Sequence, residues 1–153
     1  MTAQPARRLP DSKNPRPVDA AWGSRLRRGA GVILIVDDTS DTREIYSLYL
    51  TGRGFKVPTA QDGLSGLDAA RRHQPDVIVM DLSMPGLDGI EATRRLKADP
   101  RTAHIPVVLL TAYAMHAVQV GALDAADSFL TKPCLPDELE QHLQQLLVQR
   151  RAG

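Results

Sequence analysis

The sequence is poor in cysteine and has no long apolar run. Cys134 is the single cysteine among 153 residues, so an internal disulfide is excluded and the chain suits a reducing compartment. No segment approaches the roughly 20 apolar residues of a membrane-spanning helix, and the N-terminus lacks the apolar core of a signal peptide. We therefore expect a cytoplasmic protein with no membrane partner.

Clustered basic charge is also missing from most of the chain. Of the formal net charge of +1, residues 1–30 contribute +5, from seven basic side chains against two acidic ones, which leaves −4 for the rest. A mildly acidic body argues against a nucleic-acid-binding domain, and we expect no nucleic-acid partner. Residues 1–30 also hold four prolines without any helical or strand period, so they are predicted to form a flexible, basic, proline-rich tail.

The body of the chain, residues 31–150, alternates short apolar runs with amphipathic stretches. The runs are typical of buried parallel strands, because they are brief and several are rich in β-branched residues. We predict strands over 32–36, 55–59, 77–80, 105–110 and 128–131. Helices are predicted from a cap at Thr39 or Ser40 to Gly52, and over 64–73, 89–98, 112–125 and 136–150.

The periodicity of three helices also predicts which side chains share a face. Ile45, Leu48 and Tyr49 share one face of the first helix, whereas Leu64, Leu67 and Ala70 are expected to point inward from the second. One side of the last helix carries four leucines: Leu139, Leu143, Leu146 and Leu147.

This alternation of strands and helices predicts the α/β class, with right-handed crossovers and a doubly wound, five-stranded parallel sheet. In the flavodoxin-like strand order 2-1-3-4-5, the topological switch point lies between the first and third strands, where such folds bind ligands. Asp37 and Asp38 follow the first strand, and Asp81 follows the third. The sequence therefore predicts that three carboxylates converge at the carboxyl edge of the sheet.

Converging carboxylates repel one another unless a cation lies among them. A hard divalent ion with oxygen ligands is expected, and an incomplete protein cage favours Mg²⁺, with Mn²⁺ as a substitute. The fourth and fifth strands end in Thr111, a hydroxyl donor, and Lys132, a positive charge. This set is suited to phosphoryl transfer onto a carboxylate, with Asp81 as the nucleophile.

Four motifs occur in a characteristic order: V-D-D, M-D-L-S-M-P-G-L-D-G, L-L-T-A and F-L-T-K-P. Together they resemble the receiver domain of two-component response regulators over about residues 31–150. The resemblance implies that Asp81 accepts phosphate from a histidine kinase or a histidine phosphotransfer protein. It also implies that Asp38 and Asp81 ligate the metal directly, Asp37 through water, and Ser83 through its backbone carbonyl.

The same resemblance assigns roles to the residues that follow the fourth and fifth strands. Lys132 would pair with the phosphorylated Asp81, Thr111 would move toward the phosphate, and Phe129 would be a rotating aromatic switch. The peptide bond before Pro133 would be cis. The chain is expected to act as a stand-alone receiver that signals through a phosphorylation-dependent contact with a downstream protein.

Simpler interpretations stay open for each residue. Asp37 and Asp38 could cap the first helix, Lys132 could be a solvated strand end, and Phe129 could belong to the core. Two other functions are also consistent with the fold. One is a phosphatase of the haloacid dehalogenase type, although such phosphatases use an Asp-x-Asp pair, whereas Asp37 and Asp38 are adjacent. The other is an interaction module that is never phosphorylated.

The chain departs from the receiver pattern around its fourth helix. The sequence before the fifth strand, Ala125-Ala126-Asp127, lacks the glycine that commonly ends this helix, so the helix end must be frayed or rebuilt. The helix itself has almost no charged face. Its apolar residues Met115, Val118 and Val120 predict an output face for a protein partner or for a homodimer.

Overall fold

The computed structural model describes residues 31–112 and 122–152 of the chain. The predicted tail, residues 1–30, lies outside the described residues, as do Met115, Val118 and Val120 of the predicted output face. The strands are β1 (Ile33–Val36), β2 (Thr59–Ala60), β3 (Val77–Asp81), β4 (Val107–Thr111) and β5 (Ser128–Thr131). The helices are α2 (Ser40–Gly52), α3 (Gly63–His73), α4 (Gly89–Ala98), α6 (Ala122–Ala125) and α7 (Pro136–Ala152).

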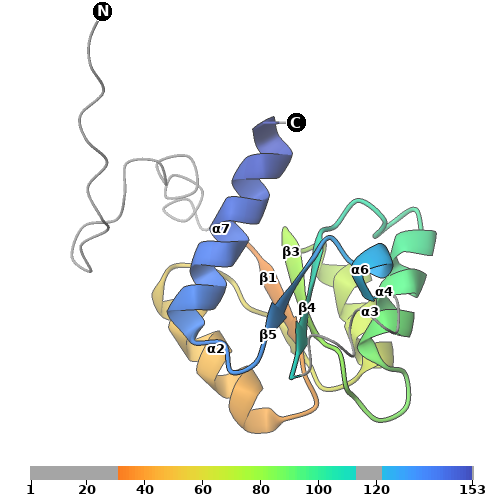
Figure 1. The fold of residues 1–153 in the computed structure, drawn as a ribbon, viewed down its shortest axis with the longest axis horizontal. Helices are drawn as coiled ribbons and strands as arrows, with labels where there is room; N and C mark the ends of the chain where they lie inside the picture. Colours follow the sequence, from red (N-terminus) through yellow and green to blue (C-terminus); the bar gives the residue numbers. More distant parts are fainter. Residues whose placement is uncertain (1–30, 113–121, 153) are drawn as a thin grey trace, which may run out of the picture.

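The five strands form one parallel sheet in the order β2-β1-β3-β4-β5, which confirms the predicted topology. Helices cover both faces of this sheet: α2 and α7 pack on one face, and α3, α4 and α6 pack on the other (Figure 1). Because every strand runs in the same direction, all five carboxyl ends lie at one edge.

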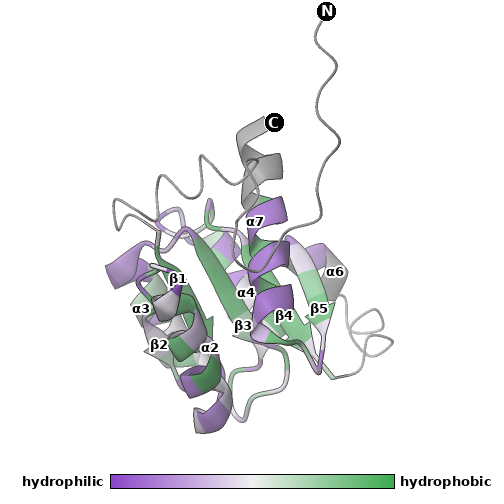
Figure 2. Ribbon diagram, turned by 90° about the vertical axis from the view of Figure 1, so that its left-hand side faces the viewer, coloured by the Kyte–Doolittle hydropathy of each residue, from purple (hydrophilic) through white to green (hydrophobic). Residues whose placement is uncertain are grey.

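Each face of the sheet has its own apolar core. Along β1, Leu34 and Val36 belong to the core under α3 and α4, whereas Ile33 and Ile35 belong to the core under α2 and α7. Successive strand residues point to opposite faces, so a strand covered on both sides must be apolar throughout. Figure 2 shows this arrangement as mainly hydrophobic strands between helices that contain both hydrophilic and hydrophobic residues.

The second strand differs from its prediction. We predicted residues 55–59, whereas β2 comprises only Thr59 and Ala60, and Lys56 forms an isolated bridge with Val32. Pro58 has no N–H to donate, and its carbonyl accepts a hydrogen bond from the Ile35 N–H at 3.1 Å. The chain therefore follows the edge of β1 with little regular pairing until it has passed the proline.

Two helices bury different residues from those that hydropathy emphasises. The prediction that Leu64 points inward is wrong, because this residue is 64% exposed, whereas Leu67 and Ala70 are buried as expected. On α2, the buried residues are Tyr46 and Leu50, and the face that carries Ile45 and Leu48 is exposed. The last helix buries Leu139 and Leu143 as predicted and half-buries Leu146.

An ion pair follows the helix that lacks the usual terminal glycine. After α6, the Asp127 N–H donates to the Val107 carbonyl at 3.0 Å, and Asp127 Oδ2 accepts a hydrogen bond from the Val107 N–H at 2.8 Å. Lys97 Nζ of α4 lies 2.8 Å from the same carboxylate oxygen. A carboxylate thus anchors the start of β5 to that of β4, shortly after a helix that ends without a glycine.

Candidate functional site

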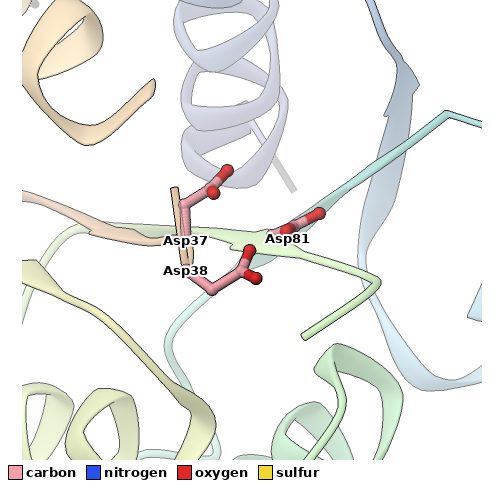
Figure 3. Close-up of side chains that lie close together, drawn as sticks. All are labelled: Asp37, Asp38 and Asp81. Atoms are coloured by element: carbon pink, nitrogen blue, oxygen red, sulfur yellow. The ribbon is translucent and has the colours of Figure 1, made fainter. Parts of the chain in front are cut away.

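Two neighbouring strands deliver three acidic side chains to the carboxyl edge of the sheet. Asp37 and Asp38 follow β1 directly, and Asp81 is the last residue of β3, which pairs with β1. One carboxylate oxygen from each of the three residues lies within 4.8 Å of the others (Figure 3). The predicted convergence of the three acids is therefore present in the folded chain.

The Asp37 carboxylate is buried and has two different environments. Its Oδ1 accepts a hydrogen bond from the Thr39 N–H at 2.9 Å, so Asp37 does help to begin α2, as the simpler interpretation suggested. Its Oδ2 is buried without a hydrogen-bond partner among the described residues and lies 3.5 Å from Lys132 Nζ. A buried carboxylate oxygen that accepts no hydrogen bond is costly, and a metal ion or a metal-bound water would satisfy it.

Lys132 is held at the centre of this group. Its Nζ lies 3.1 Å from Asp81 Oδ1, and its backbone N–H donates to the Thr111 carbonyl at 2.7 Å. Burial opposes the positive charge, but the hydrogen bond and the charge of Asp81 raise the pKa of Lys132 above its ordinary value. The residue is therefore a positioned cation and not a solvated strand end.

Asp81 is strongly perturbed by its surroundings. Burial and the charge of Asp37 raise the pKa of Asp81 to about 6, although Lys132 acts in the opposite direction. One positive charge thus compensates the carboxylates only partly. A divalent cation suits the set of three carboxylates because it would supply the missing charge and the oxygen coordination that Mg²⁺ prefers.

The other predicted site residues lie around this centre. Thr111 is buried at the end of β4, and Ser83 is exposed in the loop that follows β3. Phe129, in β5, is partly buried against the core under α3 and α4. The Lys132–Pro133 peptide bond is cis.

Two residues that support the site were not identified from the sequence. Arg43 Nη1 of α2 donates a hydrogen bond to the main-chain carbonyl of Asp37 at 2.7 Å. A basic residue near a helix N-terminus, where the helix dipole disfavours it, was the available signal. Gly89 begins α4 so close to β3 that an added Cβ would lie 2.9 Å from Leu82 Cα, and no sequence pattern specifies that approach.

Among the residues that the structure describes, no helix combines the length and the apolar character of a bilayer span.

Comparisons with known proteins agree with this geometry. The response regulator receiver domain family matches residues 33–144. Response regulator PleD of Caulobacter vibrioides is 44% identical over 102 residues, which cover 66% of this chain and 22% of PleD. The DNA-binding dual master transcriptional regulator RpaA of Synechocystis is 39% identical over 116 residues, covering 75% of this chain and 48% of RpaA. The chain thus spans less than half the length of these two relatives.

Solved structures of receiver domains superpose over nearly their whole length. Chemotaxis protein CheY4 of Vibrio cholerae has a TM-score of 0.70 and 31% identity, covering 76% of this chain and 98% of CheY4. The receiver domain of sensor histidine kinase PA1611 of Pseudomonas aeruginosa, described with magnesium coordinated in its active site cleft, has a TM-score of 0.71 and 31% identity. That match covers 76% of this chain and 97% of the PA1611 domain. With its fold, its acidic edge and these relatives in agreement, the chain belongs to the response regulator receiver domain family.

Proposed function

We propose that Asp81 accepts a phosphoryl group from a histidine kinase or a histidine phosphotransfer protein in the cytoplasm. The observation that carries the proposal is the position of Lys132 Nζ, 3.1 Å from Asp81 Oδ1, at the edge where three carboxylates meet. A cation beside a nucleophilic carboxylate, with acids suited to a metal, is the arrangement that phosphoryl transfer uses.

The proposed chemistry is a displacement at phosphorus. A carboxylate oxygen of Asp81 forms the new bond, the bond from phosphorus to the donor nitrogen breaks, and the departing imidazole keeps the electron pair and takes up a proton. Mg²⁺ or Mn²⁺, held by Asp37, Asp38, Asp81 and the Ser83 carbonyl, would neutralise phosphoryl oxygens. Lys132 and Thr111 would bind the remaining oxygens.

The chain would catalyse its own phosphorylation and its slow dephosphorylation, without turnover of an external substrate. A haloacid dehalogenase type phosphatase would instead hydrolyse small phosphate esters continuously. Phosphoramidate, whose phosphorus–nitrogen bond resembles that of phosphohistidine, distinguishes the two. With Mg²⁺, the intact mass should increase by one phosphoryl group per chain, and in excess EDTA it should not change. Steady release of phosphate from p-nitrophenyl phosphate would contradict the proposal.

The output of the domain would be a contact with a downstream protein, or with a second copy of the chain, that depends on the phosphoryl group. Its support comes from the sequence, in the apolar residues Met115, Val118 and Val120 between Thr111 and Lys132. Phe129 in β5 would transmit the change by moving inward. Hydrogen exchange with beryllofluoride, a phosphoryl mimic, should change within residues 112–135. Changes confined to residues 40–52 would contradict this output face.

A further inference from the structure

One side of α2 carries hydrogen-bonding side chains at intervals of about one turn. Arg43, Tyr46 and Tyr49 lie within the helix, and Arg53 follows its last residue. Residues three or four positions apart lie above one another on a helix, so these four side chains form a stripe. Arg43 and Tyr46 donate to loops of the site, and Tyr49 and Arg53 donate to α7.

The first member of the stripe holds the loop that carries the metal-binding acids. Arg43 Nη1 donates to the main-chain carbonyl of Asp37 at 2.7 Å, while the Thr39 N–H donates to Asp37 Oδ1 at 2.9 Å. Both the backbone and the side chain of Asp37 are therefore fixed from the start of α2.

The second member holds the loop that carries the lysine. The Tyr46 hydroxyl donates to the main-chain carbonyl of Cys134 at 2.7 Å, two residues after Lys132. The main-chain N–H of Lys132 itself donates to the Thr111 carbonyl at 2.7 Å. Burial raises the pKa of Tyr46 to about 12, so the hydroxyl keeps its proton throughout the physiological range.

The last two members hold α7 against α2. Tyr49 Oη lies 3.1 Å from Glu140 Oε1, and Arg53 Nε lies 2.8 Å from Glu140 Oε2. Glu140 is buried, with 6% of its surface exposed, and these bonds satisfy both of its carboxylate oxygens. They lie beyond the site and do not reach the loop that contains Lys132.

We infer that α2 acts as a bracket, a helix whose side chains bind both the loop that carries Asp37 and Asp38 (the acid loop) and the loop that carries Lys132 (the lysine loop). Tyr46, through its hydroxyl, is then a positioning residue for Lys132 in phosphoryl transfer. Arg43 and Tyr46 are three residues apart on one rigid helix, and each binds a carbonyl in one of the two loops. The Lys132 ammonium lies 3.1 Å from Asp81 Oδ1, and Tyr46 reaches the lysine loop at the Cys134 carbonyl. Tyr46 therefore acts through the backbone of the lysine loop.

This inference rests on the proposed function, and a pair of tyrosine variants tests it. Tyr46→Phe removes the hydroxyl but keeps the ring in the core, and Tyr49→Phe removes a hydroxyl one turn away that donates to Glu140. We would measure the rate of phosphorylation by acetyl phosphate at saturating Mg²⁺, together with the dissociation constant for Mg²⁺. Loss of one neutral hydrogen bond corresponds to a change of about fivefold.

Tyr46→Phe should slow phosphorylation about fivefold. Its Mg²⁺ dissociation constant should not rise above the parent's, because Asp37 and Asp38 follow β1 and Asp81 ends β3, outside the lysine loop. Tyr49→Phe should match the parent in both its phosphorylation rate and its Mg²⁺ dissociation constant. General loosening of the domain would weaken Mg²⁺ binding as well. The inference is overturned if Tyr46→Phe reacts as fast as the parent, if it loses Mg²⁺ affinity in proportion, or if Tyr49→Phe is equally slow.

Hydrogen exchange at the Lys132 amide provides a second measurement that needs no phosphoryl donor. It should become faster in Tyr46→Phe and stay unchanged in Tyr49→Phe, whereas equal exchange in all three proteins overturns the bracket. A parent that is never phosphorylated overturns the proposed function. A phosphorylated parent whose two variants behave like it overturns only the role given to Tyr46.

Discussion

Lys132 reaches across the end of a strand to form an ion pair with Asp81. Its Nζ lies 3.1 Å from Asp81 Oδ1, although β4 separates β3, which ends at Asp81, from β5, which precedes the lysine. The same ammonium lies 3.5 Å from Asp37 Oδ2 after β1. One cation thus links the ends of the first, third and fifth strands, and its removal should expose the repulsion between the acids.

Replacing Lys132 by alanine should destabilise the metal-free protein at pH 7. Two buried carboxylates lose their positive partner, and such a loss costs about 1–3 kcal/mol. Mg²⁺ should stabilise this variant more than the parent, because the ion supplies the missing charge. Urea unfolding in EDTA and in Mg²⁺ measures both effects. Lys56→Ala, at an exposed lysine outside the site, is the control and should change neither. Equal stability of Lys132→Ala and the parent in EDTA would contradict this role.

Asp38 should account for most of the response to Mg²⁺. At about one hundred times its dissociation constant, a ligand that binds only the folded state stabilises it by about 2.7 kcal/mol. We expect the thermal midpoint of the parent to rise accordingly, and that of Asp38→Ala to rise far less. Asp41→Ala removes an exposed carboxylate from the first turn of α2 and serves as the matched control. A Mg²⁺ response in Asp38→Ala as large as the parent's would count against Asp38 as a ligand.

The stability of the metal-free protein should depend on the protonation of Asp81. Burial and Asp37 raise the pKa of this carboxyl from 3.8 to about 6, so the folded state binds the proton more tightly than the unfolded state. The stabilising contribution of the proton is complete below about pH 4 and is lost as the pH rises through 6. Asp81→Asn should therefore be more stable than the parent at pH 7.

Unfolding of the two proteins in EDTA, followed between pH 4 and pH 8, measures this effect. The advantage of Asp81→Asn should shrink as the pH falls from about 6 toward 4, because Asp81 of the folded parent takes up its proton over this range. A difference in stability that does not vary with pH would show that Asp81 is ionised normally.

Gly89 should be essential for the approach of α4 to the end of β3. A Cβ at this position would lie 2.9 Å from Leu82 Cα and would collide with the Asp81 carbonyl oxygen. We expect Gly89→Ala to destabilise the fold by about 1–3 kcal/mol and to weaken Mg²⁺ binding. Gly52→Ala is the contrasting variant: a Cβ added at this position meets no atom within 4 Å, and alanine is favoured in a helix. Equal unfolding free energies for both variants would contradict the steric argument.

The sequence predicted the class of the fold because buried parallel strands leave an unmistakable apolar pattern. The bounds of α4 and β5 agree with the prediction. The edge strand was placed too early because a proline beside β1 can follow the sheet without regular pairing. Leu64 was expected inside because hydropathy alone does not show where a helix meets its neighbours.

The site, too, was predictable only in part. Its acids follow strands, so the topology was sufficient to bring Asp37, Asp38 and Asp81 together. Arg43 and Tyr46 donate to the main-chain carbonyls of Asp37 and Cys134, the second of which lies 88 residues away. Every residue type has a main-chain carbonyl, so the sequence does not indicate these contacts.

The most direct test of the account is to locate the phosphoryl group by peptide mass spectrometry after incubation with acetyl phosphate and Mg²⁺. We predict one modified residue, Asp81, in the parent and in Asp68→Asn, which alters an exposed aspartate on α3. Asp81→Asn should gain no phosphoryl group. A phosphoryl group on any other residue of the parent, or unchanged labelling of Asp81→Asn, would contradict Asp81 as the acceptor.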